Sequence, residues 1–438
     1  MKTWSRLRVS SALWAFPLVA GMAVFYFFVS FVPEFRSYED QPDYAPTVTS
    51  SVLASAYALI YAAASSLAAW ESGRLRRDGV WTLAPARHRL RVAADVLLPV
   101  ILLAWLVTTV VVAMALIRQG IAPSLPSLVL PALAMTVSLA HAVIGFVVGL
   151  VAPRLIAAPL LAVGVFYAVA ASWSYEPFWL RHVSGQFPVD LMYGELPTLR
   201  ALVPHILFAG SIATGLVVLC ALRSGTRQRI VLTALGCAIA VAGTVTAQRM
   251  TADWDFNPPL STGHVPVRCV GTAPAVCAPE AMAGDLDVIQ GEVRAALAQL
   301  NAAGVSTSDL TSVNDSSASG RHAPASTTQA WWFSLVNSHR SGTTPLAIVT
   351  HAVRFPCDEP DPVISRSAML WAAVTADAED FYLDWQQDEM RQYIDGESWL
   401  AEARDRVAEA RRLPLPEQTE WFHAEMRRAC APTAEEDR

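Results

Sequence analysis

VLLPVILLAWLVTTVVVAMALI, residues 96–117, contains no Asp, Glu, Lys or Arg. A helix of about 20 apolar residues crosses the roughly 30 Å of a bilayer's hydrocarbon core. A surface helix of a soluble protein normally shows a polar face every turn or two. The stretch therefore predicts a transmembrane helix, and a buried helix in a large soluble protein is the disfavoured alternative.

Further charge-free stretches of similar length lie in the first half of the chain. The whole chain is 53% hydrophobic. We expect an α-helical integral membrane protein with about seven transmembrane helices in residues 1–248, followed by a mainly helical α+β extracytoplasmic domain in residues 249–438. The predicted spans are 13–33, 48–70, 96–117, 129–151, 155–175, 201–222 and 230–248.

The first of these stretches follows Lys2, Arg6 and Arg8, as the apolar core of a signal peptide would. It is longer than the about 7–15 apolar residues of such a core, and Pro33-Glu34-Phe35 offers no small-residue cleavage site. We therefore expect it to remain as the first transmembrane helix.

Basic residues in the short connections predict the orientation, because Lys and Arg concentrate on the cytoplasmic side. One side holds Lys2, Arg6, Arg8, Arg74, Arg76, Arg77, Arg87, Arg89, Arg91, Arg154, Arg223, Arg227 and Arg229, whereas the other holds Arg36, Arg118, Arg181 and Arg200. We expect a multi-pass protein of the cell (plasma) membrane, surrounded by lipid, with a cytoplasmic N-terminus and an extracellular C-terminal domain. Residues 249–438 carry 15 Arg against 28 Asp and Glu, so nucleic acid is not an expected partner.

Cysteine positions agree with this orientation, because Cys269, Cys277, Cys357 and Cys430 all follow the predicted spans. Four cysteines in an oxidising compartment favour two disulfides, and sequence alone allows three pairings. We favour a short Cys269–Cys277 loop and a long Cys357–Cys430 link; free thiols are the alternative.

Periodicity gives a partial secondary structure for the C-terminal half. Leu286, Ile289, Val293, Leu297 and Leu300 recur at helical spacing before a stop at Gly304. Other helices are expected over 363–385, 398–412 and 416–430, strands over 330–336 and 346–355, and a mobile loop over 306–328.

The only lysine of the chain is Lys2, at its very start. A Walker A loop needs a lysine to hold the terminal phosphates, so this polypeptide has no P-loop ATPase site. Schiff-base catalysis by lysine is excluded for the same reason. The sequence also has no HExxH or GxSxG motif, and we expect neither an enzyme nor a bound cofactor. The spacing of His423 and Glu425 points their side chains to different helix faces, so no metal site is expected there.

Two histidines fall within the predicted spans. His141 lies near the middle of the fourth, and His205 lies near one end of the sixth. An ionisable group inside a membrane suggests a role on a substrate path, whereas a neutral histidine can also bond across a helix interface. Since no span holds Asp, Glu, Lys or Arg, an ion-coupled carrier is disfavoured.

The loop between the second and third spans begins Trp70-Glu71-Ser-Gly-Arg74 and continues through Gly79-Val-Trp81-Thr-Leu-Ala-Pro85-Ala-Arg87. It resembles the corresponding loop of type-2 ABC exporter permeases, over about 25 residues and the order of the first six helices. In that family the loop forms a short coupling helix that docks on the ATP-binding subunit. The resemblance implies ATPase coupling through Glu71, Arg74, Gly79, Trp81, Pro85 and Arg87, within residues 71–95. A purely topogenic basic loop is the alternative.

The resemblance implies a permease that exports its substrate as a homodimer or heterodimer with another permease, powered by a separate ATP-binding subunit. A seventh helix and a large C-terminal domain depart from the family pattern. They favour keeping a second hypothesis, a membrane-anchored sensor or interaction protein without transport activity.

Overall fold

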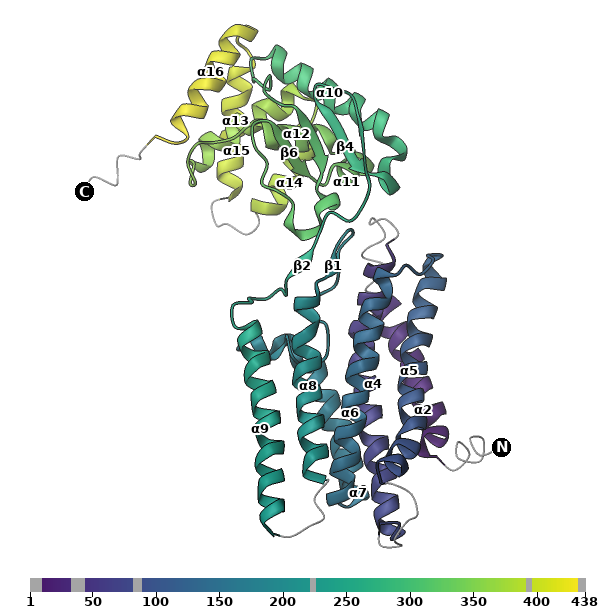
Figure 1. Ribbon diagram of the computed structural model, residues 1–438. Coiled ribbons are helices and arrows are strands. Elements are labelled where there is room, and N and C mark those ends of the chain that lie inside the picture. Colours follow the sequence, from purple (N-terminus) through teal and green to yellow (C-terminus); the bar gives the residue numbers. More distant parts are fainter. Residues whose placement is uncertain (1–9, 33–43, 82–88, 221–225, 391–395, 432–438) are drawn as a thin grey trace, which may run out of the picture. The chain divides into compact units, whose positions relative to one another are not determined.

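The computed structural model describes residues 10–32, 44–81, 89–220, 226–390 and 396–431. Contacts divide the chain into two compact units, Met1–His264 and Val265–Arg438. We call them the membrane unit and the C-terminal unit; Figure 1 shows the elements of each.

The described part of the membrane unit holds seven helices that are long and apolar enough to cross a bilayer. The prediction of a multi-pass helical membrane protein is therefore confirmed. The helices are α2 (Ser11–Tyr26) with η1 (Phe27–Phe31), α4 (Ala45–Arg77), α5 (Arg89–Gln119), η2 (Pro126–Leu128) with α6 (Val129–Val151), α7 (Arg154–Ala170) with η3 (Ala171–Ser174), α8 (Leu199–Cys220) and α9 (Thr226–Thr251).

Helix α4 lies at the centre of this unit and packs against α2, α5, α6 and α7. Small residues allow the close approach, as is usual between membrane helices. A Cβ atom placed on Gly145 of α6 would lie 2.0 Å from the carbonyl oxygen of Ser65. At Gly149 it would lie 2.2 Å from the carbonyl oxygen of Ala69. The C-terminal half of α4 is therefore held against α6 by close backbone contact.

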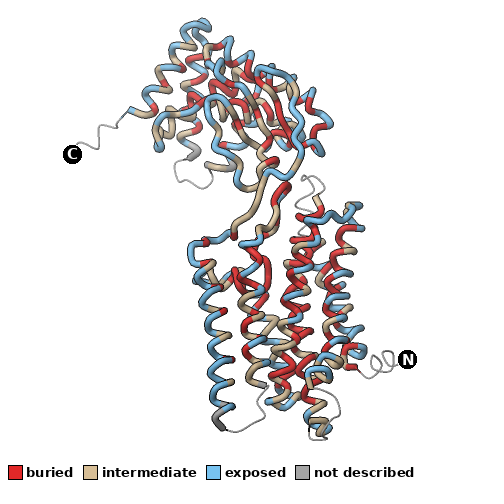
Figure 2. The backbone as a smooth tube through the Cα atoms, in the orientation of Figure 1, coloured by how far each residue is buried: buried red, intermediate tan, exposed pale blue. Residues whose placement is uncertain are grey.

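The seventh helix, α9, is peripheral. It packs mainly on α8, where Gly215 and Gly236 face one another, and α8 in turn packs on α6. Figure 2 shows α9 largely exposed, in contrast to α4. A two-residue ladder, β1 (Leu196–Pro197) with β2 (Leu260–Ser261), joins the start of α8 to the segment after α9.

The C-terminal unit is built on a sheet in the order β3 (Val267–Val270), β4 (Ala275–Pro279), β5 (Ser312–Asp315) and β6 (Ala330–Phe333). Strands β3 and β4 are antiparallel, whereas β4, β5 and β6 are parallel. The crossover from β4 to β5 runs through η5 (Glu280–Asp285) and α10 (Leu286–Ala302). The remaining helices are α11 (Leu335–Arg340), α12 (Thr344–Ala352), α13 (Pro362–Thr375), α14 (Glu379–Met390), α15 (Gly396–Ala410) and α16 (Leu415–Arg428).

The core of this unit confirms the predicted apolar face of α10. All five residues at its helical spacing, Leu286, Ile289, Val293, Leu297 and Leu300, are buried. Trp371 of α13 is also fully buried; its ring stacks on Phe422 at 4.8 Å between centroids, and its Nε1 donates to Gln418 Oε1 at 3.1 Å. Helices α10, α13 and α16 therefore contribute to one core.

Three expectations for this unit were wrong. Residues 346–355 lie mostly in helix α12 and form no strand, because Thr344-Pro345 supplies a helix start that outweighs the β-branched side chains. Residues 306–328 contain β5 and the 3₁₀ turns of η6 (Ser316–His322), since the buried Asp315 carboxylate accepts hydrogen bonds from Ser317 N and Val336 N. The single helix over 363–385 is broken into α13 and α14 near Asp377, whose φ is +55°.

Both favoured disulfides are present. Cys269 and Cys277 are directly opposed in the β3–β4 ladder, which places the two thiols within bonding reach. Cys357 and Cys430 link the segment after α12 to the end of α16. The pairing preferred from sequence spacing is therefore confirmed.

Candidate functional sites

The carboxylate of Glu71 lies inside the helical bundle. The hydropathy profile placed it just beyond the second span, but α4 continues to Arg77 and leaves Glu71 only 1% exposed. Its Oε1 accepts a hydrogen bond from the backbone N of Ser11, at 2.5 Å, and its Oε2 lies 3.0 Å from Nη2 of Arg74. Ser11 begins α2, where the helix dipole favours a negative charge. Glu71 therefore ties α4 to the start of α2.

The same end of α4 also contacts α6 and α7. Arg76 Nη1 donates to the carbonyl oxygen of Val151, the last residue of α6, at 2.8 Å. The guanidinium of Arg154, at the start of α7, lies 4.7 Å from the ring centroid of Trp70. One helical segment, residues 70–77, thus holds the ends of three neighbouring helices; we call it the α4 junction.

The chain turns sharply after the α4 junction. Gly79 has a φ of +63°, which a residue with a side chain rarely adopts. Arg89 Nη2 donates to the carbonyl oxygen of Trp81 at 3.3 Å, and its guanidinium lies 5.6 Å from the Trp81 ring centroid. Pro85 and Arg87 lie outside the described residues. The predicted docking role of this loop stays a prediction.

A second candidate site lies in the connection between α7 and α8. We call residues 181–191 the buried segment, because all but Ser184 and Asp190 are buried although the segment is not helical. Tyr61 Oη donates to the carbonyl oxygen of Gly185 at 2.8 Å, and the backbone N of Leu191 donates to Ser50 Oγ at 3.0 Å. Tyr61 lies roughly 24 Å along α4 from Ala45, at about 1.5 Å per residue. The segment therefore reaches the middle of α4.

Irregular backbone at this depth is tolerated only where protein covers it or where it lines a polar cavity. The sequence analysis treated Arg181 as part of a short connection and missed this feature. Two signals were available: the connection is long, and Val183, Phe187, Val189 and Leu191 make it more apolar than a surface loop.

His141, for which the sequence leaves a substrate path and helix packing as alternatives, contacts Tyr61. Their rings stack with centroids 4.9 Å apart and planes at 10°. His141 Nδ1 is buried and has no hydrogen-bond partner among the described residues. His205 contacts the same residue, Gly185, whose backbone N donates to His205 Nδ1 at 3.1 Å. The structure thus brings both histidines to the buried segment, while a role in transport stays a prediction.

Arg181 and His182 begin the buried segment, and both side chains are fully buried. Arg181 Nη2 donates to the carbonyl oxygen of Pro188 at 2.9 Å, and His182 Nε2 donates to that of Asp255 at 2.9 Å. Burial lowers the pKa of the Arg181 guanidinium. Burial also lowers the pKa of His182. The hydrogen bond to the Asp255 carbonyl partly opposes this shift, and the neighbouring Arg181 cation adds to it.

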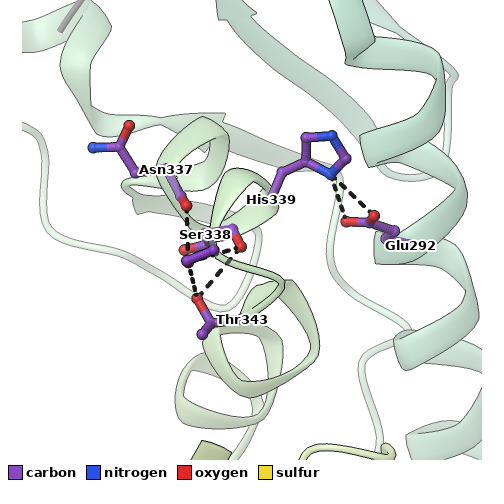
Figure 3. A network of polar contacts seen from close by, with 6 residues as sticks. Glu292, Asn337, Ser338, His339 and Thr343 are labelled. Carbon is purple, nitrogen blue, oxygen red and sulfur yellow. Dashed lines mark hydrogen bonds and ion pairs between the residues drawn. The ribbon is translucent and has the colours of Figure 1, made fainter. Parts of the chain in front are cut away.

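The C-terminal unit shows polar contacts but no described group of three His, Cys, Asp or Glu side chains that could hold a metal. Figure 3 shows His339 of α11 bonded to the Glu292 carboxylate of α10, at 3.0 Å. Glu425 is buried and forms ion pairs with Arg406 and Arg428.

A groove of about 1380 Å³ opens beside α13 and α14 in this unit. Its lining includes four aromatic side chains and four carboxylates: Phe355, Tyr382, Trp385, Trp399, Asp358, Glu359, Asp361 and Glu389. Trp385 is 44% exposed, which is unusual for so large an apolar side chain.

No protein-family model, no curated protein and no solved structure matches this chain. Its function must therefore be inferred from its own residues.

Proposed function

We propose that this chain is the membrane-spanning permease subunit of an ABC exporter and that a separate ATPase docks on its cytoplasmic loop, residues 71–95. The observation that carries the proposal is the α4 junction. Residues 70–77 continue the central helix and contact the ends of α2, α6 and α7 through Glu71, Arg76 and Trp70.

A coupling element must pass one movement to several helices. Packed helices shift as rigid elements, so a displacement applied at the turn after Arg77 would move α4 and, through its junction contacts, its neighbours. The buried segment bonds to the same helix near its start, at Ser50, and at its middle, at Tyr61. Movement of α4 would thus act both on the ends of the neighbouring helices and on the buried segment.

The energy must come from another chain, because Lys2 is the only lysine and no Walker A motif exists. In the proposed assembly, two permease subunits, identical or different, each bind one ATPase. The C-terminal unit then lies outside the cell, in agreement with its two disulfides.

Co-expression with the candidate ATPase from the same genome tests the proposal. Exposed residues of the loop should carry docking, so Arg77→Glu with Asp78→Arg is expected to abolish co-purification. Glu71→Gln should retain the ATPase but reduce its stimulation, because Glu71 is buried and can only transmit movement. Arg200→Glu, an exposed charge change in the first turn of α8, is the matched control. Co-purification that survives the double charge reversal would contradict the docking site.

The groove of the C-terminal unit favours a second function, a membrane-anchored binding protein without transport. Exposed Trp385 beside Glu389 and Asp358 offers an aromatic face and negative charge to a cationic ligand. Binding of tetra-arginine to the full chain, lost in Trp385→Ala and absent with tetra-citrulline, would support this function. If the chain also binds no ATPase, the second function replaces the first.

A further inference from the structure

We infer that Arg181, together with His205, forms a binding site for an oxyanion, a phosphate or carboxylate group, at the buried segment of the membrane unit. This inference does not depend on ATPase coupling. It follows from hydrogen-bond donors that are buried without an acceptor.

The guanidinium of Arg181 is 0% exposed. Among the described residues its only hydrogen bond is the one from Nη2 to Pro188, and no carboxylate oxygen lies within 4.0 Å of it. Its Nε and Nη1 are buried without a partner. Buried donors are nearly always paired, and a desolvated cation without an anion is strongly unfavourable. A bound anion would accept from these donors and neutralise the charge of Arg181.

His205 supplies a further donor. Its Nδ1 accepts the hydrogen bond from Gly185 N, so in the neutral ring the proton is on Nε2. That Nε2 is buried and has no partner in the described part of the chain. Arg181 and His205 both bond to the backbone of the buried segment, Arg181 at the Pro188 carbonyl and His205 at Gly185 N. The free donors of both side chains therefore belong to the same segment.

The guanidinium lies over the faces of two aromatic rings. Its Cζ lies 3.7 Å from the ring centroid of Phe256 and 6.0 Å from that of Trp173. Stacked rings stabilise the cation but accept no hydrogen bonds from the edge of the guanidinium. The edge is therefore left for an oxyanion, the ligand that guanidinium geometry fits best. Phe256 is itself 51% exposed, so movement of this ring would open the site.

The same oxyanion chemistry has two sources, a phospholipid headgroup and a soluble anion. The full chain in nanodiscs of neutral phosphatidylcholine is the reference. One arm adds inorganic phosphate against sodium chloride of equal ionic strength; the other replaces a third of the lipid by phosphatidylglycerol. Thermal unfolding of the full chain is followed by tryptophan fluorescence, and bound lipid is counted by native mass spectrometry.

We expect the unfolding temperature of the wild type to rise by about 2–4 °C in one or both arms, because a ligand stabilises the state that binds it. Arg181→Gln should lose this rise, and Arg200→Gln, at an exposed arginine in the first turn of α8, should keep it. His205→Gln provides a second variant if Arg181→Gln does not fold, and a smaller rise is expected. A rise only with phosphatidylglycerol identifies a lipid site, and one only with phosphate a soluble ligand. No rise in the wild type, or equal rises in Arg181→Gln and Arg200→Gln, would overturn the inference.

Discussion

The imidazole of His141 lies nearly parallel to the phenol ring of Tyr61, with ring centroids 4.9 Å apart. Tyr61 in turn donates its hydroxyl hydrogen to Gly185. His141 of α6 is therefore connected to the buried segment through Tyr61, which lies at the middle of α4. This arrangement makes Tyr61 the residue whose removal should affect the buried segment most directly.

Tyr61→Phe should loosen the buried segment. It removes the hydroxyl and leaves the buried Gly185 carbonyl without that donor, at a cost of about 1–3 kcal/mol. A cysteine at position 184 should then react faster with a maleimide in the Tyr61→Phe background. Tyr167→Phe is the control, because Tyr167 is 69% exposed. Equal labelling rates in the otherwise wild-type chain, in Tyr61→Phe and in Tyr167→Phe would show that the Tyr61 hydroxyl does not hold the segment.

Gly145→Ala should disrupt the packing of α4 against α6. The added methyl group would lie 2.0 Å from the Ser65 carbonyl oxygen, a contact that only separation of the helices relieves. We expect a loss of roughly 1–3 kcal/mol or failure to fold. The matched control is Gly164→Ala on α7, where nothing lies within 4 Å of the new atom. Fluorescence-detected size exclusion of both variants provides the measurement, and equal profiles would argue against close packing.

Seven helices could be predicted from hydropathy because lipid offers the backbone no hydrogen-bond partners. A long apolar stretch in a membrane therefore forms a helix, and its length indicates the span. Their charged extensions could not be predicted in this way. Glu71 and Arg74 continue α4 because they pair with one another and with Ser11, and the sequence does not show those partners.

The buried segment was missed for a related reason. The ring of Phe256, far from Arg181 in the sequence, packs against its guanidinium, and the sequence does not show this contact. The error at 346–355 also arose from local propensity: Ile348 and Val349 favour strands, yet both are buried on the helix α12. In contrast, the cysteine pairs could be favoured correctly among three possible pairings, because Cys269 and Cys277 are close in sequence and their pairing leaves Cys357 for Cys430.

The two disulfides should contribute unequally to stability. In the chain-entropy model the stabilisation grows with the closed loop, which spans 73 residues for Cys357–Cys430 and 8 for Cys269–Cys277. The model gives about 4 kcal/mol for the long link and about 2.5 kcal/mol for the short one. Thermal unfolding of the two double-serine variants should therefore show the larger decrease for Cys357→Ser with Cys430→Ser. The reverse order would mean that local strain or residual structure outweighs loop length.

Acidification should destabilise the C-terminal unit through His351. This ring contacts Phe333, with centroids 4.7 Å apart, and burial is the main cause that lowers its pKa, with a smaller contribution from Arg354. Because the folded-state pKa is below the unfolded value of about 6.5, the unfolded chain binds the proton first as the pH falls. The contribution of His351 to stability is therefore complete above about pH 6.5 and decreases below it. Unfolding temperatures at pH 7.5 and 5.5 should differ less in His351→Gln than in the wild type, whereas His322→Gln, at an exposed position, should behave as the wild type does. An unchanged difference in His351→Gln would assign the acid sensitivity to other groups.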